Sequence, residues 1–375
     1  MTALKGMTWS HPRGYDPMVA TARAFKEKTG VEIVWDKRSL QDFETFPVEE
    51  LARQYDLIVI DHPHVGQITA EACLTPLDIP GREAERAAMA RHSVGRSYES
   101  YTYAGHQWAF PIDAATQVMA YRPDLLPTPP RSWDDVVALA RAGKVTLPMR
   151  PPHAMMSFFT LAANLGTPCA TTGPGDLIAP AAGARVVALL RAVTDHIAPG
   201  DFDIDPIVAS ETLAGDTSPV AVMPLGYGYL SYALKNFRPH RLKFTNIPVA
   251  GTLGPVGSAL GGTGIAVSAF STQREAAINY AYWVAGEAIQ KTLYASSGGQ
   301  PGHGRAWEDA AVNAPVDDFY RNTRATLEGA YVRPRHNGYM AFQDAASHRL
   351  NAGLKSGEAA ESIVAALNTL FRESF

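Results

Sequence analysis

The stretch from Gly105 to Asp124 is the feature that most limits what this chain can fold into. An apolar segment with the character of a strand reaches Pro111, a few polar residues follow, and a second apolar run begins without the turn residues of a hairpin. Later, the glycine-dense residues 254–264 run in the same way into the apolar residues 265–267. Two such crossings, far apart in the sequence, predict two lobes hinged over a cleft.

The elements before the first crossing alternate between strand and helix. Residues 4–9, 31–35 and 57–60 are short apolar runs typical of strands that are covered on both faces. Asp16 followed by Pro17 predicts the start of a helix between the first two strands. Alternation of this kind predicts an α/β fold with a mostly parallel sheet.

Capping patterns mark helices beyond the crossing. Ser132 with Asp135 is a capping box that opens a predicted helix over residues 133–142, and Thr272 with Glu275 predicts a second helix start. A strand is expected at residues 145–147. The last predicted helix carries an apolar stripe at i, i+4, i+7 and i+8, formed by Ile363, Leu367, Leu370 and Phe371.

Length and charge narrow the classes of function. A chain of 375 residues favours two domains or one large one, and its 46% hydrophobic and 19% charged residues are those of a globular protein. The net charge of −4 without long charge runs excludes an obvious nucleic-acid or anionic-membrane partner. The two cysteines, Cys73 and Cys169, fall on opposite sides of the first crossing, so we expect buried thiols and no disulfide.

The N-terminus passes almost directly from Met1 into the first predicted strand. It has neither a basic n-region nor an apolar h-region of 7–15 residues, so the chain as written is not expected to be exported. Trimming of a signal peptide is the alternative, and the localisation stays open at this point.

Five stretches repeat the order and spacing of one protein family. They are Gly105 to Asp124, Pro130 to Asp135, Val220 to Gly226, Gly261 to Ala266 followed by Glu275 to Ala277 and Trp283, and Gly298 to Pro301. In these stretches the chain resembles the extracellular solute-binding proteins of bacterial ABC importers, in particular the sugar-binding group that includes maltose-binding protein. Members of this family normally act in the periplasm.

The resemblance implies a two-lobed periplasmic-binding-protein-like fold of type II. With the two crossings it places the N-terminal lobe at residues 1–112 and 262–315, and the C-terminal lobe at 113–261 and 316–375. The hinges are expected near 111–115 and 255–262, where glycines can absorb backbone changes on closure. The glycine-rich stretch lacks the full G-x-G-x-x-G and P-loop patterns, which argues against nucleotide binding.

Loops after strands are the expected place for a site in an open α/β sheet. Two of them lie in the first predicted lobe. The segment after the first strand offers a helix N-terminus for a polar or anionic group, although Arg13 pairing with a surface carboxylate is the alternative. The resemblance to sugar-binding proteins implies that Asp61 hydrogen-bonds a hydroxyl of the solute, whereas at least one of the nearby histidines is expected only to shape its loop. The candidate residues there are His11, Arg13, Tyr15, Asp61, His62 and His64.

The remaining candidates lie at or beyond the first crossing. Trp108, Asp113 and Gln117 combine an aromatic ring with carboxylate and amide groups, as sugar recognition does, and a core tryptophan is the equal alternative for Trp108. Tyr227 and Tyr229 supply phenols, and the resemblance implies an aromatic residue near here that faces the ligand, for which Tyr227 is favoured over Tyr229. The histidines have no metal-ligand spacing, so neither a metal nor another cofactor is expected.

Two functions of different classes follow from this pattern. The first is a monomeric solute-binding protein that closes on a small polar ligand, a carbohydrate or an organic acid, and delivers it to an ABC permease. The basic side chains near a helix N-terminus tilt this prediction towards an anionic ligand. The second is a cytoplasmic enzyme or sensor on the same fold, because fold does not fix function. Its acid and base groups would be Asp61, His64, His11 and Asp113.

Thiaminase-like enzymes show one form of that alternative. They have the same fold and carry a nucleophilic cysteine near the first crossing. Residues 111–117 contain no cysteine, so this chemistry is not expected here.

Overall fold

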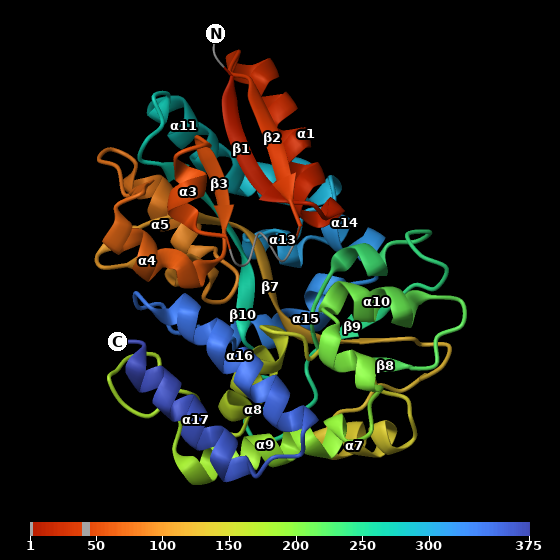
Figure 1. Ribbon diagram of the computed structural model, residues 1–375. Helices are drawn as coiled ribbons and strands as arrows, with labels where there is room; N and C mark the ends of the chain where they lie inside the picture. Colours follow the sequence, from red (N-terminus) through yellow and green to blue (C-terminus); the bar gives the residue numbers. More distant parts are fainter. Residues whose placement is uncertain (1–2, 40–45) are drawn as a thin grey trace. The chain divides into compact units, whose positions relative to one another are not determined.

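The computed structural model describes residues 3–39 and 46–375 (Figure 1). The chain divides into two compact units, and neither unit is a continuous piece of sequence. Unit 1 consists of residues 1–114, 261–314 and 335–337, and unit 2 of residues 115–260, 315–334 and 338–375. Closure of the units as hinged lobes stays a prediction.

The strands hydrogen-bond in the order β2-β1-β3-β10-β7-β8, with β4 beside β10 and β9 beside β7, while β5 and β6 form a separate pair. Their bounds are β1 Leu4–Trp9, β2 Ile33–Arg38, β3 Leu57–Ile60, β4 Leu74–Thr75, β5 Thr102–Tyr103, β6 His106–Gln107, β7 Phe110–Tyr121, β8 Val222–Tyr227, β9 Lys243–Thr245 and β10 Leu260–Ser268.

The sheet is mixed, so the prediction of a mostly parallel sheet is wrong beyond its first strands. β1 runs parallel to β2 and β3, whereas β10 is antiparallel to β3, and β8 and β9 are antiparallel to β7. Every residue of β3 is buried, as expected for an apolar run with both faces covered. In this sheet, each antiparallel pair includes β7 or β10, and these are the two strands that pass from one unit to the other.

The crossings lie inside strands. We expected a break after Pro111, but β7 continues without interruption to Tyr121, because a proline in its second position still allows an extended backbone. The second half of the glycine-rich crossing is likewise part of β10, which begins at Leu260. A Cβ atom on Gly264 would lie 2.8 Å from the ring of Tyr101, so close packing explains at least this glycine.

Helices of unit 1 surround its strands, and α1 packs beside β1 and β2 (Figure 1). Their bounds are α1 Pro12–Thr29, α3 Val48–Ala52, α4 Val65–Glu71, α5 Glu83–Arg91, α6 Ser97–Ser100, α11 Arg274–Ala285, α12 Glu287–Ile289, α13 Gly304–Glu308 and α14 Ala310–Asn313. Short 3₁₀ or π turns occupy His62–His64 and Gln290–Tyr294.

The helices of unit 2 build its main core, in which α8, α9, α16 and α17 pack together (Figure 1). Their bounds are α7 Trp133–Arg141, α8 His153–Asn164, α9 Pro180–Thr194, α10 Pro206–Ala214, α15 Phe319–Glu328, α16 Tyr339–Lys355 and α17 Ala360–Glu373. Short 3₁₀ turns occupy Pro199–Asp203, Leu230–Ala233 and, at the start of this unit's later segment, Ala314–Val316.

Two local predictions are confirmed and two are wrong. The capping box at Ser132 is present in full. Along α17, Ile363, Leu367 and Phe371 are fully buried, and Leu370 is partly buried against the same core. In contrast, Gln273 precedes α11 without a side-chain cap, and residues 145–147 form only a single bridge, from Val145 to Val222.

A short third segment of the chain, residues 335–337, joins unit 1 without any signal in the sequence. Residues 335–337 pack backbone to backbone against α4, where a Cβ atom on Gly66 would lie 1.9 Å from the carbonyl oxygen of Arg335. The Arg335 guanidinium donates to the carbonyls of Glu99, Ser100 and Thr102 at 3.0, 2.7 and 2.9 Å. This arginine therefore binds the segment to the C-terminal end of α6.

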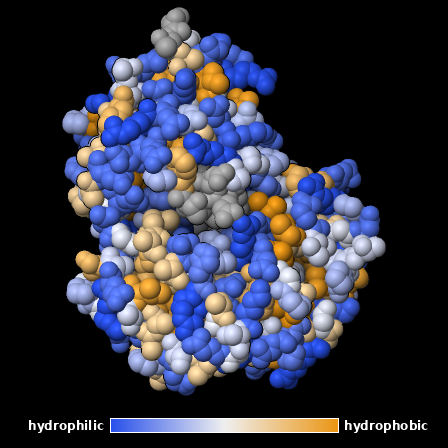
Figure 2. Space-filling view, viewed as in Figure 1, coloured by the Kyte–Doolittle hydropathy of each residue, from blue (hydrophilic) through white to orange (hydrophobic). Residues whose placement is uncertain are grey.

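Hydrophilic residues dominate the face of the molecule that Figure 2 shows. Cys73 and Cys169 are buried free thiols, which confirms the prediction. Burial raises the pKa of Cys73 to about 12. Within residues 3–39 and 46–375, no helix is long and apolar enough to cross a bilayer.

Candidate functional site

The first candidate group lies at the start of α1. The helix begins at Pro12, five residues before Pro17, so the predicted start at Asp16 is wrong. His11 supplies the cap, because its Nδ1 accepts the backbone N–H of Arg13 at 3.1 Å. Trp9 covers Gly14 so closely that a Cβ atom there would lie 2.3 Å from the indole. The expected loop is therefore mostly the first turn of a helix.

Arg13 forms an ion pair with Asp113 inside unit 1. Nε of Arg13 donates to Oδ2 of Asp113 at 2.8 Å, and Nη2 donates to Oδ1. Both side chains are almost completely buried. Burial raises the pKa of Asp113, and the guanidinium opposes that rise. Since the two-point geometry pairs the two charges, this part of the predicted site carries no net charge from them.

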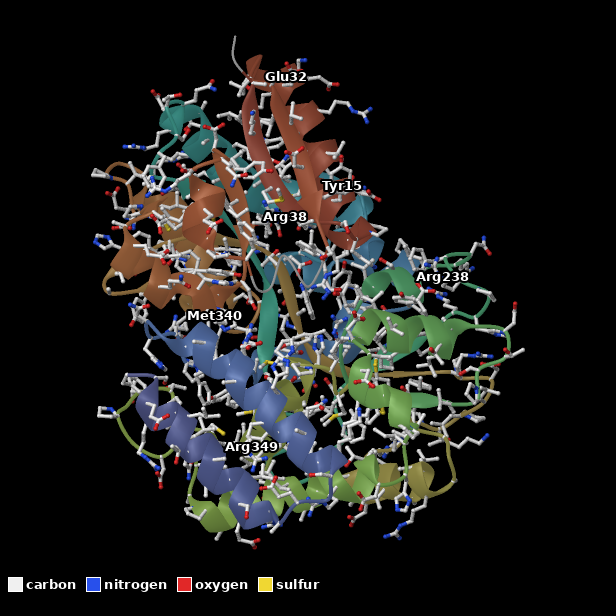
Figure 3. All side chains as sticks on the ribbon, in the orientation of Figure 1. Tyr15, Glu32, Arg38, Arg238, Met340 and Arg349 are labelled. Carbon is white, nitrogen blue, oxygen red and sulfur yellow. The ribbon has the colours of Figure 1, made fainter. Side chains whose placement is uncertain are left out.

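Tyr15 is half-buried near the same helix start and is labelled in Figure 3. Nζ of Lys37 lies 4.3 Å from the centre of its ring. An ammonium group at this distance is attracted by the face of a phenol ring. Tyr15 thus packs α1 against the end of β2.

Asp61, His62 and His64 form a second group directly after β3. The Asp61 carboxylate accepts the backbone N–H of His62 at 2.8 Å and lies 3.2 Å from Nδ1 of the same histidine. The His62 ring meets Tyr101 edge to face, with ring centres 6.2 Å apart. His64 is also buried. The carboxylate therefore caps the 3₁₀ turn that follows it, a loop-shaping role that we expected of one of the histidines and not of Asp61.

Trp108 lies in the apolar cluster beside β3 and is 5% exposed. Its indole N–H donates to the carbonyl of Tyr103 at 3.1 Å. This environment is the one expected of a core tryptophan.

Gln117 belongs to a buried polar network in unit 2. Its Nε2 donates to Ser157 at 3.0 Å, and its Oε1 accepts from Thr160 at 2.7 Å. The backbone carbonyl of Gln117 also accepts from Ser258 at 2.6 Å. Gln117 is fully buried, so in this structure its amide supports α8.

Tyr227 ends β8 and stands directly opposite Gln117 in the antiparallel register. Residues opposite one another in such a pair share one face of the sheet. The Tyr227 ring meets the imidazole of His153 with ring centres 6.2 Å apart. Tyr229 is buried at the start of the next 3₁₀ turn.

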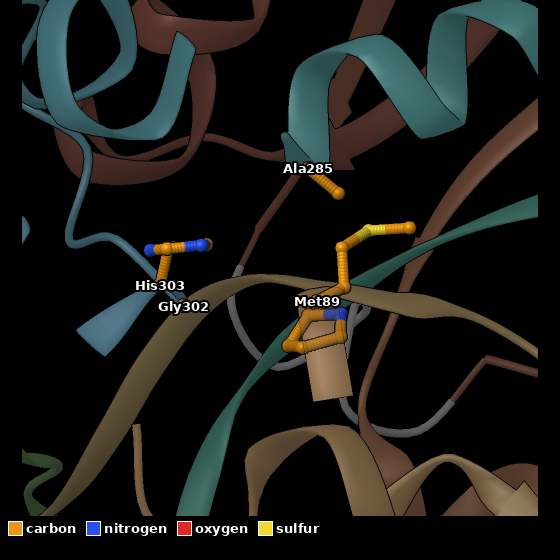
Figure 4. Close-up of a pocket in the computed structure, with 5 residues that line it drawn as sticks. Met89, Ala285, Gly302 and His303 are labelled. Carbon is orange, nitrogen blue, oxygen red and sulfur yellow. The ribbon is translucent and has the colours of Figure 1, made fainter. Parts of the chain in front are cut away.

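A small pocket in unit 1 is lined by Met89, Pro111, Ala285, Gly302 and His303 (Figure 4). Its volume of about 10 Å³ suits roughly one water molecule. A sugar is far larger, so this pocket is no solute site.

The structure brings the candidates together in three groups. Arg13 joins Asp113 in unit 1, the residues 61–64 share one turn, and Gln117 lies opposite Tyr227 in unit 2. Across residues 3–39 and 46–375, no group of three or more histidine, cysteine, aspartate or glutamate side chains is placed to hold a metal. His153, at the start of α8, is not among the candidates from the sequence, and its ring meets that of Tyr227.

Comparison with known proteins identifies the family. Residues 20–315 match the family described as bacterial extracellular solute-binding protein, and the chain belongs to it. A comparison with curated protein sequences gave no match.

Solved structures of the same fold cover almost the whole chain. One is the maltose-bound MalE3 of T. maritima, with a TM-score of 0.84, 14% identity and complete coverage of both chains. A second is a solute-binding protein from Agrobacterium radiobacter K84 in complex with ribitol, with a TM-score of 0.80, 20% identity and coverage of 100% of this chain and 99% of that one. A third is a protein from Thermotoga lettingae bound to α-D-tagatose, with a TM-score of 0.84, 14% identity and complete coverage of both chains.

The recognition made from sequence motifs is thereby confirmed, and so is the two-lobed periplasmic-binding-protein fold class. The chain is a member of a solute-binding family, and the solute-binding function predicted from its sequence stands with it.

Proposed function

We propose that the protein binds a neutral carbohydrate or polyol and delivers it to an ABC permease. Membership of the solute-binding family supports the class of function. The proteins of the same fold that bind maltose, ribitol and tagatose support a hydroxyl-rich solute.

The ion pair between Arg13 and Asp113 is the observation that favours a neutral solute. The expected anionic ligand depended on Arg13 as a cation at the start of α1. Its charge is matched within unit 1 by a buried carboxylate at 2.8 Å. A solute anion would have to compete with this carboxylate for the same guanidinium, which is costly for a buried pair.

The binding surface of unit 1 in this proposal comprises the start of α1 and the turn at residues 61–64. In unit 2 it comprises the end of β8, where Tyr227 offers a partly exposed aromatic ring. Aromatic rings pack on the C–H face of a sugar while polar groups bind its hydroxyls. Closure of the two lobes on the solute is part of the proposal.

A thermal-shift panel tests this function. Maltose, ribitol and D-tagatose are added beside gluconate and glucuronate, which carry a carboxylate on a similar skeleton. A solute at 100 times its Kd stabilises the protein by about 2.7 kcal/mol, which gives a measurable rise in Tm. A rise with a neutral compound only is the expected result. A rise with the acids alone would contradict the neutral class, and native mass spectrometry of protein purified without added solute supplies an independent check.

A further inference from the structure

Asn337 is the one asparagine of the 375-residue chain that a glycine follows. Every other asparagine precedes a residue with a side chain. A glycine has no Cβ atom, so its backbone nitrogen can approach the side chain of the preceding residue without steric hindrance. The pair of Asn337 and Gly338 therefore places an amide carbon next to an unhindered backbone nitrogen.

Both groups of this pair are free to react. Asn337 is exposed, and neither its side-chain amide nor the backbone N–H of Gly338 has a hydrogen-bond partner within the described residues 3–39 and 46–375. Three asparagines elsewhere are buried and donate from Nδ2 to backbone carbonyls, namely Asn164, Asn313 and Asn368. Hydrogen bonds hold those amides in place, whereas the amide of Asn337 can turn towards its own backbone.

The fold requires glycine at position 338. Gly338 precedes α16 with a φ of 106°, a left-handed conformation that favours glycine. A Cβ atom on it would lie 2.2 Å from the carbonyl oxygen of Ser374, so any other residue would meet the backbone at the end of α17. The same glycine that lets the start of α16 approach the end of α17 leaves the amide of Asn337 open to attack.

From these features we propose that Asn337 is a site of spontaneous deamidation, a modification in which water is the only co-reactant. The backbone nitrogen of Gly338 loses its proton and forms a bond with Cγ of Asn337. The bond from Cγ to Nδ2 breaks, and Nδ2 leaves as ammonia with the proton. The product is a five-membered succinimide ring.

Water then opens the succinimide in one of two ways. Addition at Cγ breaks the bond from Cγ to the nitrogen of Gly338 and leaves an aspartate. Addition at the backbone carbonyl carbon of Asn337 breaks the original peptide bond and leaves an isoaspartate, in which the chain runs through Cβ and Cγ. In both reactions the hydroxyl of water stays on the carbon, and its proton returns to the nitrogen of Gly338.

The two products differ in their effect on the fold. An isoaspartate lengthens the backbone by one methylene, next to a segment packed so closely that a Cβ atom on Gly66 would lie 2.7 Å from the backbone nitrogen of Asn337. An aspartate keeps the backbone and adds a negative charge just before α16, whose first turn holds no acidic residue. Such a charge favours a helix N-terminus. Isoaspartate should therefore lower the stability of the protein, and aspartate should not.

Ageing of the folded protein at mildly alkaline pH tests the proposal. Trypsin releases residues 336–349 as a peptide in which Asn337 is the only asparagine. Ageing in heavy-oxygen water labels this residue only if deamidation precedes digestion, and mass spectrometry measures the labelled fraction. A protease that cleaves before aspartate but not before isoaspartate separates the two products. Asn236 is the internal control, because it is also exposed but Phe237 follows it.

We expect the labelled fraction at Asn337 to rise with time and with pH, and to exceed that at Asn236 throughout. Higher pH accelerates the reaction because the nitrogen of Gly338 must lose its proton. The variant Asn337→Gln should gain far less mass, since its longer side chain would have to close a six-membered ring. The Tm of the wild type should fall as isoaspartate accumulates, whereas freshly purified Asn337→Asp should unfold at or above the temperature of fresh wild type.

Two results would overturn the modification site. Labelling of Asn337 only after unfolding in urea would show that the packing of residues 335–337 prevents ring closure in the folded protein. Equal labelling of Asn337 and Asn236 would remove the role of Gly338. An equal fall of Tm in aged Asn337→Gln would overturn the effect on the fold, because this variant forms little isoaspartate.

Discussion

Arg13 and Asp113 lie 100 positions apart in the chain and form a buried two-point ion pair within unit 1. Arg13 belongs to the first turn of α1, and Asp113 lies in β7 just before this strand passes into unit 2. The pair therefore connects the start of the first helix to the last part of β7 that belongs to unit 1.

Breaking this pair should destabilise the protein. Arg13→Ala or Asp113→Asn leaves one buried charge uncompensated, and we expect a loss of 3–5 kcal/mol in the free energy of unfolding, measured by urea denaturation. The double variant Arg13→Met with Asp113→Leu should recover most of this loss, because it leaves no charge behind. Single variants within 0.5 kcal/mol of the wild type would show, by the usual range of neutral surface substitutions, that the two charges are not buried in solution.

Removing the Gln117 amide should cost stability through its two partners on α8. Gln117→Leu leaves the hydroxyls of Ser157 and Thr160 buried without their bonds, so we expect a loss of about 1–3 kcal/mol in urea denaturation. A double-mutant cycle with Thr160→Val should give a coupling energy of at least about 0.5 kcal/mol. Additive effects in the cycle would argue against the network.

Stability should decline as the pH falls from about 6.5 towards 4. The pKa values of His153 and His303 are lowered by burial from 6.5 to about 4, so in this window the unfolded chain takes up protons that the folded protein does not. The stabilising contribution is complete above pH 6.5 and is lost as the pH approaches the folded pKa. For His153 the loss should be on the order of 2 kcal/mol by pH 4.5. Urea denaturation of His153→Leu across the same range should show a shallower decline, whereas an identical slope would exclude His153 as the cause.

A methyl group on Gly66 should disrupt the packing of residues 335–337. The added carbon would meet backbone atoms of Arg335, His336 and Asn337 at 1.9–2.7 Å, and backbone cannot rotate away as a side chain can. Gly66→Ala should therefore lower the free energy of unfolding by about 1–3 kcal/mol or more. Gly175→Ala is the control, because nothing lies within 4 Å of the added carbon there. Equal stabilities of the two variants would contradict the tight packing.

Elements that depend only on residues close together in the sequence could be predicted from it. The capping box at Ser132 needs only two side chains and one helix start, and the stripe from Ile363 to Phe371 needs only helical spacing. The start of α1 was misplaced because histidine is an uncommon cap and Asp16 with Pro17 is a stronger pattern. The true cap depends on a contact between His11 and the backbone of Arg13, which no spacing rule reports.

The candidate site was less accessible to such reasoning, because its groups are defined by partners distant in the sequence. The segment expected as a loop after β1 is mostly the first turn of α1, and the neutralisation of Arg13 depends on Asp113. The amide of Gln117 looks like a solute contact in the sequence, and only the position of α8 reveals Ser157 and Thr160 as its partners. The contact between the rings of His153 and Tyr227 also joins residues distant in the sequence, which a sequence pattern cannot show.

The return of residues 335–337 to unit 1 affects how this chain can be made. A ribosome releases the N-terminal residues first, and domains usually fold as they emerge. Unit 1 lacks its last segment until Asn337 has been synthesised, after the strands β8 and β9 and the helices α7 to α10 and α15 of unit 2. The first strands of unit 1 are therefore made long before residues 335–337 complete this unit. A nascent chain that is interrupted before Arg335 would leave α4 and α6 without the backbone that covers them.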